Sequence, residues 1–90
     1  MESFGAQVHV KLKPGIADPQ GQTIERALPA LGYEGVSEVR VGKLIEFELE
    51  ANDAGDAETR AAEMCERLLA NTVIESYEVN ISSGPHKEEA

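Results

Sequence analysis

Hydrophobic and polar residues alternate along three stretches of the chain, and this two-residue period is typical of strands that bury one face. The three stretches cover residues 8–12, 45–49 and 77–81. A fourth stretch, 36–41, has valine at three of its six positions and predicts a further strand. Gly42 and Lys43 separate this stretch from 45–49, and a glycine-containing pair between two such stretches predicts a hairpin.

Two other stretches show the 3.6-residue period of an amphipathic helix. The first, 18–31, is predicted to begin at Asp18, whose carboxylate can accept from the free N–H groups of a first helical turn. Pro29 lacks the N–H that an unbroken helix needs, so it predicts a kink or a short final turn. The second, 56–70, has the more regular apolar stripe, and Asn71, which tolerates the left-handed conformation, is its predicted end.

The order strand, helix, strand, strand, helix, strand predicts an α+β fold. This β-α-β-β-α-β order forms a two-layer sandwich, in which both helices cover one face of an antiparallel or mixed sheet. Residues 1–82 are predicted to form this single domain. The remaining residues, 83–90, contain glycine, proline and several charges, and we expect them to be a disordered tail.

The other face of the predicted sheet has no helix over it, and its side chains are polar. Its expected members are His9, Lys11, Lys13, Glu46, Glu48 and Glu50. A helix-free sheet face in a small domain is a natural place for a second copy of the chain, so we expect a homo-oligomer that uses this face. The three glutamates either are exposed to water or contact a cationic partner, and the sequence does not choose between these two alternatives.

The acidic residues are concentrated in one half of the chain. In 90 residues there are 17 Asp and Glu against 8 Lys and Arg. Residues 1–45 hold five acids and five bases, whereas residues 46–90 hold twelve acids and three bases. A net charge of −9 repels phosphate backbones and anionic lipid, so nucleic acid and membrane surfaces are poor candidates for partners.

Several features of the sequence favour a cytoplasmic protein. The single cysteine permits no internal disulfide, which fits a reducing compartment. The first residues lack the basic and apolar regions of a secretion signal. No stretch approaches the ~20 apolar residues that a membrane-spanning helix needs.

The sequence contains no recognisable catalytic, cofactor-binding or metal-binding motif. His9 is expected on a strand surface and His86 in the tail, and neither has a base, acid or nucleophile at a recognised spacing. Cys65 lies on an apolar helix stripe, where a buried thiol acts as a small hydrophobic side chain. One cysteine and two distant histidines do not supply the four ligands of structural zinc. If the chain takes part in catalysis, it does so as part of a larger assembly.

Three turn-containing segments, 11–21, 38–43 and 68–75, together carry a family resemblance. In this order and at this spacing, they closely resemble the PurS family, the small subunit of phosphoribosylformylglycinamidine synthase, also called formylglycinamide ribonucleotide amidotransferase. The resemblance runs from about residue 8 to residue 81. Two positions depart from the family pattern: Thr72 stands where many members have proline, and Pro29 interrupts a helix that is expected to be continuous.

The resemblance implies a non-catalytic subunit of a glutamine-dependent, ATP-consuming ligase in de novo purine biosynthesis. In such systems a large synthetase subunit, PurL, uses ATP and Mg²⁺ to activate the substrate, and a glutaminase subunit, PurQ, releases ammonia. The PurS-like subunit forms dimers or higher oligomers, is needed for the other two to assemble and supports ammonia transfer between them. It holds no cofactor of its own. The alternative is a stand-alone regulatory module of ferredoxin-like shape that binds a small ligand.

Six residues in the resembling segments are candidates for a partner interface: Asp18, Gly21, Arg40, Gly42, Lys43 and Asn71. Each also has a simpler structural explanation. Asp18 and Gly21 fit a helix start, Gly42 a tight hairpin and Asn71 a helix end. The two cations, Arg40 and Lys43, fit either an acidic partner surface or salt bridges to glutamates 46 and 48 on the neighbouring strand.

Overall fold

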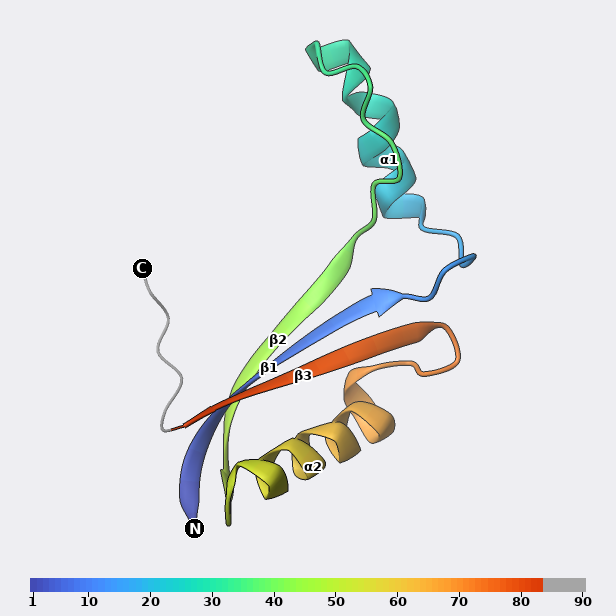
Figure 1. Ribbon diagram of the computed structural model, residues 1–90. Coiled ribbons are helices and arrows are strands. Elements are labelled where there is room, and N and C mark those ends of the chain that lie inside the picture. The colour runs from blue at the N-terminus through green and yellow to red at the C-terminus, as the bar shows by residue number, and fades with distance from the viewer. Residues whose placement is uncertain (84–90) are drawn as a thin grey trace.

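The computed structural model describes residues 1–83, and its elements form an α+β fold (Figure 1). Three strands and two α-helices follow in the order β1 (Glu2–Leu12), α1 (Pro19–Ala27), β2 (Gly42–Ala51), α2 (Ala54–Met64) and β3 (Glu75–Ser83). A short 3₁₀ turn, η1 (Pro29–Leu31), follows α1, and a π-helical turn, η2 (Cys65–Leu69), continues α2. The predicted tail lies outside the described residues, apart from Ser83, which ends β3; His86 lies outside them too.

The sheet has the order β2-β1-β3, with β1 in the centre and both pairings antiparallel. Val8 lies opposite Ile45 on one side and Val79 on the other, while Gln7 lies opposite Glu46 and Asn80. Because side chains alternate between faces along a strand, this register gathers apolar residues on one face and polar residues on the other. The antiparallel sheet and the period-2 alternation are therefore confirmed.

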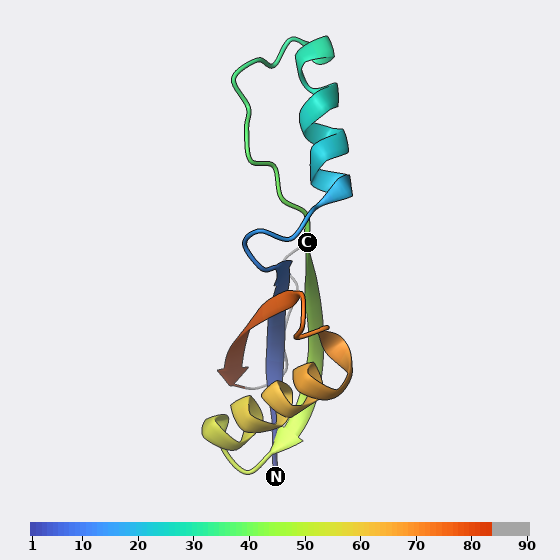
Figure 2. The same cartoon turned by 90° about the vertical axis from the view of Figure 1, so that its right-hand side faces the viewer.

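The apolar face of the sheet packs against α2, and this contact forms the core (Figure 2). The buried hydrophobic side chains of β1 are Phe4, Ala6, Val8 and Val10. The helix contributes Ala57, Ala61 and Cys65, each with no exposed surface. Small side chains at these positions let the helix lie close to the strands. Burial raises the pKa of the Cys65 thiol, which agrees with a packing role.

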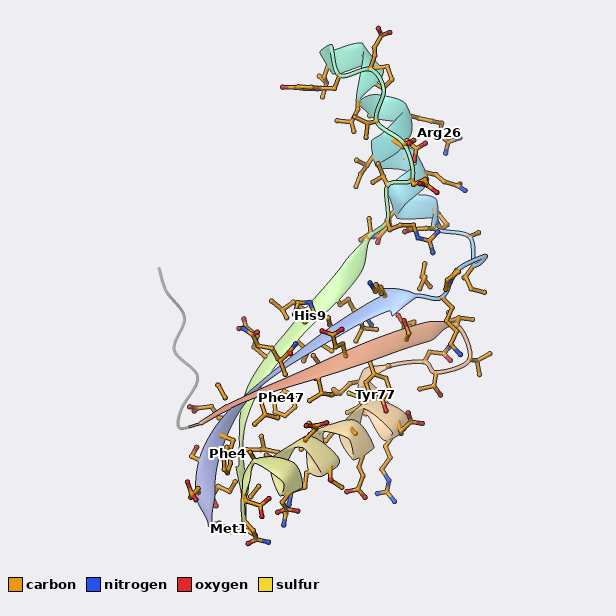
Figure 3. All side chains as sticks on the ribbon, viewed as in Figure 1. Met1, Phe4, His9, Arg26, Phe47 and Tyr77 are labelled. Atoms are coloured by element: carbon orange, nitrogen blue, oxygen red, sulfur yellow. The ribbon has the colours of Figure 1, made fainter. Side chains whose placement is uncertain are left out.

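Within residues 1–83, no helix covers the opposite face, as the sequence predicted. Figure 3 shows His9 on the side of the sheet away from α2. The register places Glu46, Glu48 and Glu78 on this same face. The use of this face in oligomerisation stays a prediction.

Two parts of the predicted sandwich are wrong. Residues 36–41 form a loop and no strand, so the sheet has three strands and no hairpin at Gly42 and Lys43; β2 begins at Gly42 itself. In addition, α1 does not cover the sheet: it extends beyond the start of β2 (Figure 1), so among the described residues only α2 packs on the apolar face. We call residues 18–41 the α1 arm.

Hydrogen bonds from the loop to α1 and its cap explain why residues 36–41 form no strand. The backbone N–H of Val39 donates to Glu25 Oε1 at 2.9 Å, and that of Val41 donates to Asp18 Oδ2 at 2.8 Å. These groups are therefore paired with side chains of the arm and are not available for a strand ladder. Glu38 adopts a left-handed conformation with φ of 57°, which also breaks the extended chain. The loop runs back along α1 to the start of β2 (Figure 2).

Candidate functional site

Asp18 lies where the α1 arm joins the sheet, and it holds both ends of the arm. Its Oδ1 accepts from the N–H of Gly21 at 2.9 Å, which caps the first turn of α1. Its Oδ2 accepts from the N–H of Val41, the last residue before β2. The residue is 4% exposed and is the one buried charged residue in the described part of the chain. We call the group of Asp18, Gly21, Val39, Arg40 and Val41 the arm junction.

The hydrogen bond from Gly21 and then that from Val41 hold the pKa of Asp18 below its usual range, and the nearby Arg40 guanidinium adds to this effect. Burial acts in the opposite direction but does not cancel these contributions. Asp18 is therefore a charged structural group, poorly suited to proton transfer near neutral pH.

Gly21 is required by the close approach of two backbone segments. A Cβ atom at this position would overlap the carbonyl oxygen of Val39. The helix and the returning loop therefore touch at a residue that has no side chain. Gly42 has a similar role at the start of β2, where a Cβ would come within 2.7 Å of the carbonyl oxygen of Val10.

Arg40 closes the junction from the outside. Its guanidinium donates to the carbonyl oxygens of Ile16 at 3.2 Å and Lys13 at 3.4 Å, and its Nε lies 4.0 Å from Asp18 Oδ2. The side chain remains 43% exposed. Part of the Arg40 side chain therefore stays accessible to solvent or to a partner.

A second cluster lies beside the junction, in the turn before β3. Lys43 Nζ is 3.7 Å from Glu75 Oε2, and Glu75 Oε1 accepts from the N–H of Asn71 at 2.7 Å. Asn71 Oδ1 accepts from the N–H of Val73, so Asn71 organises the turn. Lys13 Nζ donates to the carbonyl oxygen of Thr72 at 2.7 Å, which ties the end of β1 to the same turn.

The structure brings most of the candidate residues to one end of the sheet. A hollow beside the arm is lined in part by Asp18, Gly42 and Lys43. A second hollow contains Arg40, Gly42 and Lys43 together with His9 and Lys11. Gly21 is buried between helix and loop, and Asn71 lies in the turn joined to Lys43 through Glu75.

The sequence left two alternatives open for Arg40 and Lys43, which were salt bridges to glutamates 46 and 48 or contact with an acidic partner surface. Among the described residues, these two cations form ion pairs with Asp18 and Glu75. Sequence reasoning also missed Glu25, which accepts from the N–H of Val39 in the arm junction, and Glu75, which pairs with Lys43 in the second cluster. Glu25 lies seven residues after Asp18 on α1, and this spacing places both acids on one helix face, which is the only local signal for its role.

The junction end is the cationic part of an acidic chain. Four of the eight Lys and Arg residues lie there: Lys11, Lys13, Arg40 and Lys43. Within residues 1–83, no three His, Cys, Asp or Glu side chains are grouped so that they could hold a metal ion. Hydrogen-bonded turns hold Arg40 and Lys43 in place beside Asp18 and Glu75, and both cations keep partly exposed side chains.

Comparison with known proteins decides the family. The PurS family, described as phosphoribosylformylglycinamidine (FGAM) synthase, matches residues 5–83. The chain belongs to the PurS family. It is 48% identical over 75 residues to the synthase subunit PurS of Synechocystis, covering 83% of this chain and 75% of that protein. With the PurS subunit of Mycobacterium leprae it shares 50% identity over 78 residues, covering 87% and 95%.

The chain is also similar to one chain in a solved structure that is named for three proteins, PurL, PurQ and PurS. A chain in the structure of PurLQS from Thermotoga maritima superposes with a TM-score of 0.82 at 36% identity, covering 91% of this chain and all of that one. The PurS match begins in β1 and ends with β3, so the arm junction and both helices lie within the part common to the family. None of the helices in the described residues is long and apolar enough to cross a membrane.

Proposed function

We propose that this chain is a non-catalytic subunit of phosphoribosylformylglycinamidine synthase in de novo purine biosynthesis, and that it acts in the cytoplasm. The observation that carries the proposal is the PurS match over residues 5–83, which runs from within β1 to the end of β3. The similarity to a chain of the Thermotoga maritima PurLQS structure supports a place beside PurL and PurQ. In this assembly the chain forms a dimer or tetramer with copies of itself.

The proposal assigns the chemistry to the other subunits. PurL activates the substrate with ATP and Mg²⁺, PurQ releases ammonia from glutamine, and this chain holds the two together and supports ammonia transfer. The chain itself requires no cofactor. The turns at the arm junction and before β3 are suited to this role, because their hydrogen bonds hold the backbone next to the exposed side chains in one conformation.

The six candidate residues divide into two groups in the proposed interface. Asp18, Gly21, Gly42 and Asn71 shape the backbone of the junction and its neighbouring turn. Arg40 and Lys43 present exposed charge, with side chains 43% and 58% exposed. The two cations are therefore the residues that we expect to contact an acidic partner surface.

Lys43→Gln should weaken assembly with PurL and PurQ and leave the fold unchanged. The Lys43–Glu75 pair is more than half exposed at Lys43, and such pairs are worth at most about 1 kcal/mol, so the thermal midpoint should move by no more than about 5 °C. Arg60→Gln on α2 is a matched control, because it removes one positive charge from another partly exposed pair, with Asp56. Complex formation is measured by size-exclusion chromatography with light scattering. Equal weakening by both variants would contradict a specific contact at Lys43.

Reconstitution tests the proposed function directly. Formylglycinamidine synthesis by PurL and PurQ is measured with and without this chain, first with glutamine and then with ammonium as the nitrogen source. We expect synthesis to depend on the chain with glutamine and to be independent of it with ammonium. Independence in both cases would overturn the proposal and favour a regulatory module, which a screen for saturable binding of small ligands would then address.

A further inference from the structure

A cationic hollow lies on the helix-free face of the sheet, at the end next to the arm junction. Its volume is about 490 Å³, and small-molecule sites in proteins measure roughly 300–1,000 Å³. Figure 3 shows His9 on this face, away from α2. We call this space the β1 hollow, and the side chains in its lining include His9, Lys11, Arg40 and Ser76.

The strand register explains why there is space around Lys11. Lys11 lies on the central strand, between Gly42, which has no side chain, and Ser76, which has a short one. His9 lies two residues before Lys11 and therefore on the same face, and its cross-strand neighbours have larger side chains. The row that contains Lys11 is thus the low part of this face, and the ammonium group has open space on both sides.

The hydrogen-bond donors of the hollow are available to a ligand. Within residues 1–83, the side chains of Lys11 and His9 take part in no hydrogen bond or ion pair. The Ser76 hydroxyl makes only a long hydrogen bond of 3.5 Å, to the carbonyl oxygen of Lys11. At the rim, two backbone carbonyl oxygens hold the Arg40 guanidinium in place. These donors come from three segments of the chain and border one space, which is the arrangement that binds an anion.

A phosphate group fits this arrangement better than a carboxylate. Phosphate presents three terminal oxygens in different directions, so it can accept from donors on several sides, and cationic donors form its strongest hydrogen bonds. A carboxylate has two oxygens in one plane. The positions of Lys11 and Arg40 in the lining place the phosphate at the end of the hollow next to the arm junction.

The other end of the hollow has different chemistry. Glu78 lies opposite His9 and is the one carboxylate among the described residues of the lining. It repels a phosphate but accepts hydrogen bonds from hydroxyl groups. Leu44, on the other side of His9, adds an apolar wall. We propose that the β1 hollow binds a small hydroxyl-bearing phosphate monoester, of the sugar phosphate class, with its phosphate at Lys11 and its hydroxyl groups at Glu78.

Titration of the full chain tests the inference, with backbone amide NMR signals followed at constant ionic strength. The probes are ribose 5-phosphate, inorganic phosphate and ribose. We expect ribose 5-phosphate to bind saturably and to shift the signals of residues 9–11 and 76–78. Inorganic phosphate should bind several times more weakly, and ribose should not bind. Binding of ribose as tight as that of ribose 5-phosphate would overturn the inference.

Lys11→Gln should raise the dissociation constant for ribose 5-phosphate about tenfold, because a charge-assisted hydrogen bond is lost. Arg67→Gln is the matched control. It removes the same charge from an exposed position on η2, which packs on the other face of the sheet, and should leave the dissociation constant unchanged. Equal weakening by the two variants would overturn the inference, because net charge alone would then explain the binding.

Glu78→Ala tests the other end of the hollow. It should abolish the preference for ribose 5-phosphate over inorganic phosphate, and a preference that survived would overturn the placement of the hydroxyl groups. If neither phosphate compound bound saturably, the inference would be wrong, and this is also the result expected if a second copy or a partner protein covers the hollow. Binding is measured on this chain alone, so its failure is distinct from a failure of the reconstitution with PurL and PurQ.

Discussion

Gly21→Ala is expected to destabilise the protein by about 2 kcal/mol, although alanine is normally the better helix former. Gly21 lies in the first turn of α1, and a methyl group there would overlap the carbonyl oxygen of Val39. That oxygen belongs to a backbone segment held by Glu25 and Asp18, so it cannot move aside without breaking their hydrogen bonds. The free energy of unfolding, measured by urea titration, checks this expectation.

Gly55→Ala is the matched control for this substitution. Gly55 lies in the first turn of α2, and a methyl group there would meet only Asp53 Oδ1, at 3.4 Å. We expect this variant to be neutral or more stable by about 0.5 kcal/mol, because alanine loses less conformational entropy on folding. If Gly21→Ala were as stable as Gly55→Ala, the close packing of loop and helix in the arm would be wrong.

The effect of Gly21→Ala should also differ between parts of the molecule. The core between α2 and the sheet does not include Gly21. Hydrogen exchange should therefore show earlier opening of residues 18–41, with protection in β1 and α2 reduced much less. This pattern would identify the arm as a separate unit of stability, attached to the sheet through its junction.

The elements that the sequence predicted correctly are those determined by local pattern. Alternation of apolar and polar residues predicts β1, β2 and β3. The observed β1 begins earlier than predicted, at Glu2. The regular spacing of apolar residues along α2 predicts a helix with one buried side, and in the structure this side packs on the sheet. Asp18 was predicted as a helix cap because its hydrogen bond to Gly21 spans only three residues.

The errors concern contacts between residues far apart in the sequence. Residues 36–41 have the composition of a strand, but their N–H groups pair with Glu25 and Asp18, which lie 14 and 23 residues away. The partner of Lys43 is Glu75 for a similar reason, since β1 brings the ends of β2 and β3 together. An apolar stripe on α1 predicts burial but does not specify the surface that buries it. A surface on another molecule satisfies the same pattern.

Asp18→Asn should loosen the arm junction and lower the thermal midpoint by about 5 °C or more at neutral pH. The amide retains one oxygen acceptor, but its nitrogen would face one of the two N–H groups that Asp18 now satisfies, Gly21 or Val41. One buried N–H would lose its partner, and the attraction to Arg40 would be lost as well. Differential scanning calorimetry measures the midpoint.

The same substitution should change the response of stability to acid. The pKa of Asp18 is lower in the folded protein than in the unfolded chain, mainly because of the hydrogen bonds from Gly21 and Val41. Its stabilising contribution is therefore complete above the unfolded value of about 4 and is lost as the pH falls through the lower folded value. The difference in thermal midpoint between wild type and Asp18→Asn should shrink on going from pH 7 to pH 2.

Asp56 provides the control for this pH dependence. Its pKa is also lowered, first by the N–H of Asn52 and then by Arg60, so it contributes acid lability of the same sign from the N-terminus of α2. Asp56→Asn should remove the contribution of Asp56 to the pH dependence of stability and leave the contribution of Asp18 unchanged. If the difference between wild type and Asp18→Asn stayed constant over this pH range, the ionised carboxylate would not be what holds the arm to the sheet.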